Sequence, residues 1–113
     1  MKLLIVGSRS IKNFDLSKYV PKSTDLIISG GANGIDTLAE KYADDHRISK
    51  LIIRPQYNLY RKSAPLKRNE KMIDIADYIL VIWDGVSKGT EYSINYARKN
   101  NKELFVINIK ENN

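Results

Sequence analysis

The segment 26–43 constrains the fold more than any other part of the chain. It opens with three apolar residues, 26–28, as expected for a parallel strand that is buried on both faces. The polar and glycine-rich stretch 29–34 (S-G-G-A-N-G) follows. Apolar residues then recur with the spacing of one helical stripe: Ile35, Leu38, Ala39, Tyr42 and Ala43. The segment therefore predicts a strand, a glycine turn and a helix.

Such a unit is typical of phosphate sites. Glycines let the backbone approach a ligand closely, and at the start of a helix the free N–H groups and the helix dipole point at the same place. A tight strand–helix turn that binds nothing is the alternative, and the glycines alone do not decide between the two.

Apolar runs predict five strands in all, which alternate with helices. The expected strands span 2–6, 25–28, 50–53, 77–83 and 103–108. We expect helices from Asp15 to about Val20, from Ile35 to about His46, from Ala64-Pro65 onward and over 90–99, and a loop over 54–63, which lacks a clean period. The alternation predicts one α/β domain over 1–113, Rossmann-like, with three αβα layers and a mainly parallel five-stranded sheet.

The charge of the chain favours an anionic partner. Its 113 residues include 19 Lys and Arg against 13 Asp and Glu, a net charge of +6, which suits a nucleotide, a nucleic acid or a phosphate ester. A lysine-rich solvated surface would give the same total. With no cysteine and one histidine, His46, which we expect to cap a helix, we predict no metal site and no cofactor. No apolar run approaches membrane-spanning length, so we expect a cytoplasmic protein without membrane contact.

Three loops are expected to meet at one edge of the sheet. The first strand opens directly into G-S-R-S (7–10), and the fourth into D-G-V-S-K-G-T-E (84–91). If these two strands are neighbours, the winding reverses between them and forms a crevice, which the turn 29–34 also borders. Arg9 could clamp a phosphate or carboxylate there, and Asn69, on the inner line of its helix, needs a partner in a loop backbone or a ligand. The three loops together predict a ligand site.

Two common nucleotide-binding patterns are missing. The sequence contains no G-x-x-x-x-G-K-[ST], which argues against a P-loop NTPase. It also has no G-x-G-x-x-G after the first strand, which argues against an ordinary NAD-binding domain.

The motifs G-S-R, S-G-G-A-N-G-I-D, A-P-x-x-R-N-x-x-M, A-D and S-x-G-T, in this order, resemble the SLOG superfamily, most closely its small stand-alone, YspA/YpsA-related branch. That superfamily also includes the Rossmann-like domain of the DNA-processing protein DprA and the LOG phosphoribohydrolases, which release cytokinin bases. The resemblance covers nearly the whole chain and implies a pocket for a nucleotide or nucleotide-derived ligand. By position it implies these ligand-binding residues: Gly7, Ser8, Arg9, Ser29, Gly30, Gly31, Ala32, Gly34, Asp36, Arg68, Asn69, Ser87, Gly89 and Thr90.

The last motif departs from that of the LOG hydrolases. Those enzymes carry P-G-G-x-G-T-x-x-E with a catalytic glutamate, whereas this chain has Ser93 at that position and V-S-K (86–88) in place of the glycine pair. The catalytic residues are therefore unknown, and the candidates by position are Asp36, Asp84 and Glu91. Asp36 could equally cap a first helical turn, and Asp84 could form an Asx turn before Gly85.

Three functions are compatible with these observations. The first is a sensor or sequestering module, suited to a phage or defence setting, which binds a nucleotide-derived small molecule and covers its base with Tyr57 or Tyr60. The second is a hydrolase of an N-glycosidic or phosphoester bond of a nucleotide, which needs a general acid or base. The third is binding of single-stranded nucleic acid, as in DprA, through the basic residues of 61–71.

Self-association is a further expectation, because relatives in the superfamily are commonly dimers. Tyr92 and Tyr96 lie one helical turn apart and could form an interface stripe in a homodimer or higher homo-oligomer. They could equally cover the sheet edge as ordinary packing, and the sequence leaves both interpretations open.

Overall fold

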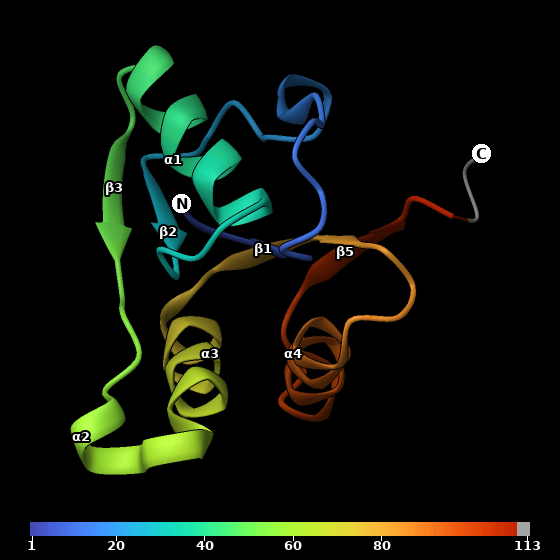
Figure 1. Cartoon of the computed structure of the whole chain (residues 1–113). Helices are drawn as coiled ribbons and strands as arrows, with labels where there is room; N and C mark the ends of the chain where they lie inside the picture. The colour runs from blue at the N-terminus through green and yellow to red at the C-terminus, as the bar shows by residue number, and fades with distance from the viewer. Residues whose placement is uncertain (111–113) are drawn as a thin grey trace.

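Five parallel strands form the centre of the fold (Figure 1). Every neighbouring pair of strands is parallel. This confirms the predicted α/β, Rossmann-like architecture, with a sheet that is wholly rather than mainly parallel. The computed structural model describes residues 1–110. The strand order is β3-β2-β1-β4-β5, with bounds β1 (Lys2–Gly7), β2 (Leu26–Ser29), β3 (Ser49–Ile52), β4 (Tyr78–Trp83) and β5 (Leu104–Asn108).

The central strand β1 is buried on both faces because its side chains are apolar at successive positions. Leu3 and Ile5 pack into the core on one face of the sheet, and Leu4 and Val6 pack into the core on the other. Successive residues of a strand point to opposite faces, so one apolar run contributes to both layers. The sheet therefore needs a covering layer on each side.

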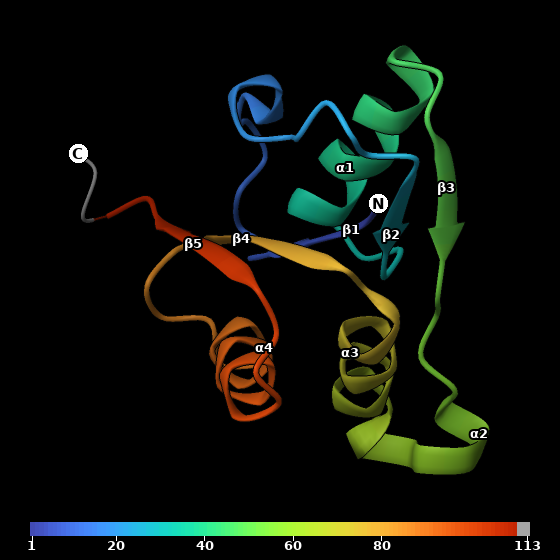
Figure 2. The ribbon, with the colours of Figure 1, turned by 180° about the vertical axis from the view of Figure 1, so that it is seen from behind.

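Helices supply these layers, as Figures 1 and 2 show. One face carries α1 and a single 3₁₀ turn, η1, whereas α3 and α4 lie next to each other on the opposite face. Strands and helices alternate as predicted. The bounds are η1 (Leu16–Lys18), α1 (Ile35–Asp45), α3 (Ala64–Ile75) and α4 (Lys88–Lys99).

Two segments differ from the prediction. The expected loop 54–63 contains a single helical turn, α2 (Tyr57–Tyr60), and a 3₁₀ turn, η2 (Arg61–Ser63). Four residues are too few to show an apolar period, and the chain turns at Arg61, with φ of 51°, without the glycine that usually marks such a turn. The helix expected from Asp15 is only η1, which Asp15 caps by accepting the N–H of Ser17 at 3.0 Å.

The start of α4 also differs, since the helix begins at Lys88 rather than at Thr90. The sequence places Gly89 in the glycine-bearing loop before the helix, whereas in the structure it lies in the first turn of α4. The side chain of Asp84 holds the residues just before α4 by accepting the N–H groups of Val86 and Ser87.

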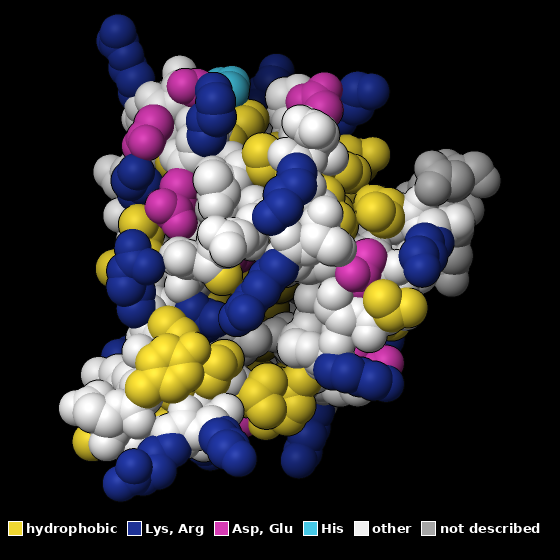
Figure 3. Space-filling model, in the orientation of Figure 1, with side chains coloured by type: hydrophobic (Ala, Val, Ile, Leu, Met, Phe, Trp, Pro, Cys, Tyr) yellow, Lys and Arg dark blue, Asp and Glu magenta, His cyan; other side chains and the backbone are white. Residues whose placement is uncertain are grey.

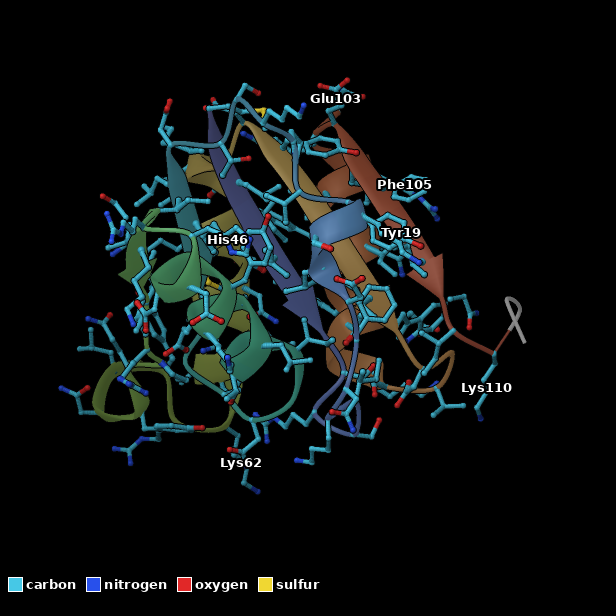
Figure 4. The ribbon with its side chains drawn as sticks, turned by 90° about the horizontal axis from the view of Figure 1, so that it is seen from above. Tyr19, His46, Lys62, Glu103, Phe105 and Lys110 are labelled. Atoms are coloured by element: carbon cyan, nitrogen blue, oxygen red, sulfur yellow. The ribbon has the colours of Figure 1, made fainter. Side chains whose placement is uncertain are left out.

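His46 ends α1 as the sequence predicts (Figure 4). Its ring atom Nδ1 lies 3.0 Å from the carbonyl oxygen of Tyr42, and its side chain is exposed. Within residues 1–110, no helix combines the length and the apolar character needed to cross a membrane. Residues 111–113 lie outside the described residues.

Tyr92 and Tyr96 connect the two helices on their face of the sheet. Tyr96 donates its hydroxyl to Asp74 of α3 at 2.9 Å, and Tyr92 donates to Glu70 of the same helix. Both hydroxyl groups therefore reach from α4 to α3, and the ring of Tyr96 also packs against the core on this face of the sheet. Both phenol hydroxyl groups therefore have hydrogen-bond partners within the same chain.

Candidate functional site

The chain reverses its winding between β1 and β4, and a hollow opens where these strands end. β2 and β3 continue the sheet on one side, β5 on the other, which is the arrangement at which open α/β sheets hold ligands. The hollow measures about 500 Å³, within the usual range of small-molecule sites. Four parts of the chain border it: the end of β1 with the loop that follows, the turn before α1 with the first turn of that helix, α3, and the start of α4.

The loop after β1 is fixed by close packing against β4. A Cβ on Gly7 would lie 2.4 Å from the carbonyl oxygen of Ile82, so no side chain fits there. The buried Ser8 donates its N–H to that same oxygen at 3.1 Å and accepts the N–H of Asp84 on its hydroxyl at 3.0 Å. These bonds join the loop to the end of β4, and the exposed Arg9 extends from this fixed backbone.

Two N–H groups of the turn 29–34 are paired with nearby side chains. The hydroxyl of Ser29 accepts the N–H of Gly31 at 3.2 Å, and the carboxylate of Asp36 accepts the N–H of Ala32 at 3.1 Å. Gly34 has φ of 76°, and a Cβ there would lie 2.6 Å from two carbonyl oxygens of the loop after β1. The glycine at this position is explained by packing within the chain. Asp36 lies in the first turn of α1, but its carboxylate accepts the N–H of Ala32 in the preceding turn rather than an N–H of the helix.

Arg68 of α3 connects that turn to the other side of the hollow. Its Nη1 donates to the carbonyl oxygen of Gly30 and, at 3.4 Å, to that of Ile53, while its Nε donates to Asn69 at 2.8 Å. A Cβ on Gly30 would lie 2.6 Å from Nη1, so the glycine makes room for the guanidinium. Burial lowers the pKa of Arg68, and the charge of Asp36 opposes that shift. Asn69 thus accepts a hydrogen bond from a side chain rather than bonding a loop backbone. The alternative of a ligand as its partner stays a prediction.

Asp36 is the acidic residue of the hollow within the part of the chain that the structure describes. Its side chain is buried, and this burial raises the pKa of the carboxyl group against the lowering effects of the Ala32 N–H and of Arg68. Buried carboxyl groups with a raised pKa occur at sites of acid–base chemistry, and also where burial is purely structural.

The other two catalytic candidates, Asp84 and Glu91, lie outside the lining of the hollow in residues 1–110. Asp84 accepts the N–H groups of Val86 and Ser87 at 2.9 and 2.8 Å, and the hydroxyls of Ser87 and Ser10 at 2.7 and 2.9 Å. Burial opposes ionisation, but these four hydrogen bonds hold the pKa of Asp84 well below its usual range. Asp84 is therefore ionised at neutral pH and shapes the loop, as an Asx turn would.

The first turn of α4 borders the hollow with Lys88, Gly89 and Thr90. N–H groups in a first turn have no helical carbonyl before them, and the helix dipole adds partial positive charge. Gly89 differs from the other glycines of the chain, because a Cβ there would meet no atom within 4 Å. Lys88 is a third cationic side chain beside Arg9 and Arg68, so positive charge exceeds negative charge around the hollow.

A second, smaller hollow of about 260 Å³ adjoins the first. Arg9, Ala32 and Arg68 line both, so the two hollows meet at the two arginines. The outer side of the second hollow comes from the segment that follows β3, including Arg54 and Tyr57.

The structure brings most of the predicted ligand-binding residues together. Gly30 and Gly31 line the second hollow, whereas Ser29 and Gly34 line neither hollow among the described residues. The remaining predicted residues line the first hollow: Gly7, Ser8, Arg9, Ala32, Asp36, Arg68, Asn69, Ser87, Gly89 and Thr90.

Sequence reasoning missed several lining residues that had a usable signal. Ser10 and Lys88 lie inside motifs already singled out, and Arg54 follows a strand at the edge of the sheet where ligands bind. Ser93 lies one turn after Gly89 and donates its hydroxyl to the Gly89 carbonyl at 3.2 Å.

Comparisons of the chain with protein-family models, with curated proteins and with solved structures find no match. The chemistry of the site is therefore judged from its own geometry. Cationic side chains and a helix N-terminus around a hollow are suited to bind an anion.

Proposed function

We propose that the protein binds a nucleotide, or another nucleotide-derived small molecule that carries phosphate, and acts as a sensor or sequestering module. One observation carries the proposal: at the reversal of winding, the start of α4 and the cationic side chains of Arg9, Arg68 and Lys88 surround a single hollow. Phosphate groups are recognised by such side chains and by helix N-termini. The resemblance of the loops to the SLOG superfamily supports the same ligand class.

Within this proposal, the phosphate groups bind on the α4 side. There the first-turn residues are open to the hollow, and Gly89 leaves space beside the backbone. The turn 29–34 is less suited, because Ser29 and Asp36 already accept N–H groups of that turn. The Asp36 carboxylate would also repel a phosphate placed against it.

A nucleotide hydrolase is the second candidate, and Asp36 is the observation in its favour. Of the three acidic candidates, Asp36 alone lines the hollow within residues 1–110, and its pKa is raised by burial. A general acid or base needs such a position and such a pKa. Its hydrogen bond to the Ala32 N–H is the competing structural role.

Thermal unfolding with a panel of nucleotides, followed by chromatography of each ligand that stabilises the protein, separates the candidates. A ligand at one hundred times its dissociation constant adds about 2.7 kcal/mol to the free energy of unfolding. Stabilisation by a ligand that is recovered intact supports the binding module, and recovery of a base and a sugar phosphate supports the hydrolase. Stabilisation by single-stranded DNA alone, with steep salt dependence, would contradict both.

A further inference from the structure

The second hollow is lined by groups that the binding of a phosphate alone does not require. One side is the turn 29–34, and the other is Arg54, Pro55 and Tyr57. Arg54 donates its Nη1 to the carbonyl oxygen of Gly31 at 3.3 Å, so its guanidinium lies against the turn. A Cβ on Gly31 would lie 2.6 Å from this nitrogen, which shows how closely Arg54 approaches the backbone.

Tyr57 is an unusually exposed aromatic side chain for a residue that lines a hollow. It leaves 57% of its surface accessible, although aromatic rings contribute most when they are buried. Figure 3 shows apolar side chains gathered over α2, next to Lys and Arg side chains that cross the middle of this face. An aromatic ring and a guanidinium group at one hollow are the two side-chain types on which nucleic-acid bases stack.

Tyr60, on the same short helix, does not share this position. It is 44% exposed and lines a third hollow, which Arg54 and Arg68 also border. Within residues 1–110, the lining of that hollow includes neither Arg9 nor any residue of the turn 29–34. The structure therefore separates the two tyrosines that the sequence could not tell apart.

We propose that the second hollow is a base subsite, in which Tyr57 and Arg54 stack on the base of a nucleotide whose phosphates lie in the first hollow. Arg9 and Arg68, which line both hollows, then lie between the base and the phosphates. Stacking is tolerant of base identity, because every base has an aromatic face. This inference rests on the proposed function, since it assigns the orientation of the same ligand.

Isothermal titration of the full chain with ADP, GDP, CDP and UDP tests the subsite, with pyrophosphate measured in competition against ADP. Tyr57→Ala should weaken binding of the nucleoside diphosphates by about fivefold to a hundredfold, the range of base–aromatic stacking, and leave pyrophosphate unchanged. Tyr57→Phe should bind like the wild type because the ring is kept. Tyr60→Ala is the matched control, with the same residue type on the same helix, and should bind like the wild type.

The outcomes separate the subsite from the proposed function. The base subsite is wrong if Tyr57→Ala binds the four nucleoside diphosphates with wild-type affinity. It is also wrong if the variant loses as much affinity for pyrophosphate as for the nucleoside diphosphates. In both cases anion binding stands. The subsite is also wrong if Tyr60→Ala has the same effect as Tyr57→Ala. If the wild type binds neither the nucleoside diphosphates nor pyrophosphate, the proposed function fails and the subsite fails with it.

Discussion

Two glycine-bearing turns lead into helices at the same edge of this sheet, and they differ in what their glycines accommodate. In the turn before α1, glycines make room for parts of the protein itself: Gly30 for Arg68, and Gly34 for the loop after β1. In the first turn of α4, Gly89 faces open space. The comparison teaches that a glycine motif at a helix start becomes evidence for a ligand only when the protein does not fill the space beside it.

The two turns also differ in the carboxylate that organises them. Asp36 accepts one N–H group of its turn and has a raised pKa because it is buried. Asp84 accepts four hydrogen bonds, which hold its pKa low despite burial. One turn thus contains a carboxylate whose charge is disfavoured, and the other a carboxylate whose charge is stabilised.

The largest expected effect comes from filling the space at each glycine. Gly34→Ala should lower the free energy of unfolding by about 3 kcal/mol or more, because a methyl group at a positive φ would overlap two backbone oxygens. Gly89→Ala, the matched change, should be neutral or stabilise by up to about 1 kcal/mol, because alanine favours a helix. Urea unfolding measures both variants, and equal losses would contradict the difference between the turns.

Removal of the Asp84 carboxylate should have the next largest effect. Asp84→Ala should lower the free energy of unfolding by about 1.5 to 3 kcal/mol at pH 7, because hydrogen bonds to a charged group are lost. Since the folded pKa is depressed, this contribution is complete above the unfolded pKa of about 3.9 and is lost as the pH falls through the folded pKa. Urea unfolding of the variant and the wild type, at pH 7 and at low pH, measures this contribution. A difference in the free energy of unfolding that stays the same at both pH values would contradict this account.

Arg9→Ala tests the cationic side of the site. Arg9 is exposed, so its removal should change the free energy of unfolding by less than about 0.5 kcal/mol. Its loss should weaken the binding of ADP by about tenfold, because a charge-assisted hydrogen bond contributes about 1.5 kcal/mol. Isothermal titration measures the affinity, and an unchanged value would remove Arg9 from the site. Arg68→Ala is a poorer test, since Arg68 also bonds Gly30 and Ile53.

The smallest effect is expected for Asp36→Asn. Because the folded pKa of Asp36 is raised, its favourable contribution is present below the unfolded pKa of about 3.9 and is lost as the pH rises through the folded pKa. The amide can still accept the Ala32 N–H, so the variant should be at least as stable as the wild type at pH 7. Thermal unfolding across pH measures this, and a large loss of stability at pH 7 would show that the charge of Asp36 is needed.

The sheet could be predicted from the sequence because the pairing of distant strands followed from patterns within short segments. Each strand is an apolar run, and the alternation with helices implied parallel pairing before any contact was known. The neighbouring position of β1 and β4, expected only as a condition, is confirmed by the strand order. The three loops around the hollow followed as well, since parallel strands end at one edge. Arg68, in contrast, was implied only by the resemblance to the SLOG superfamily.

What the sequence could not predict depends on contacts between distant residues. The role of Gly30 is fixed by Arg68, which lies far along the chain on α3. The single helical turn α2 is too short to show an apolar period. Tyr57 lines the second hollow because α2 follows the end of β3. The N–H groups that Ser29 and Asp36 accept in the turn before α1 could not be predicted either, because they depend on the exact path of that turn.

The central claim is that the anion site lies at the start of α4 and not on the turn before α1. A ¹H–¹⁵N correlation spectrum of the 13.0 kDa protein, titrated with ADP, tests it directly. The account predicts amide shift changes largest at Lys88, Gly89 and Thr90, with further changes in 7–10 and 54–57. Changes confined to 29–36, changes only along the basic segment 61–71, or no changes at millimolar ADP would contradict it.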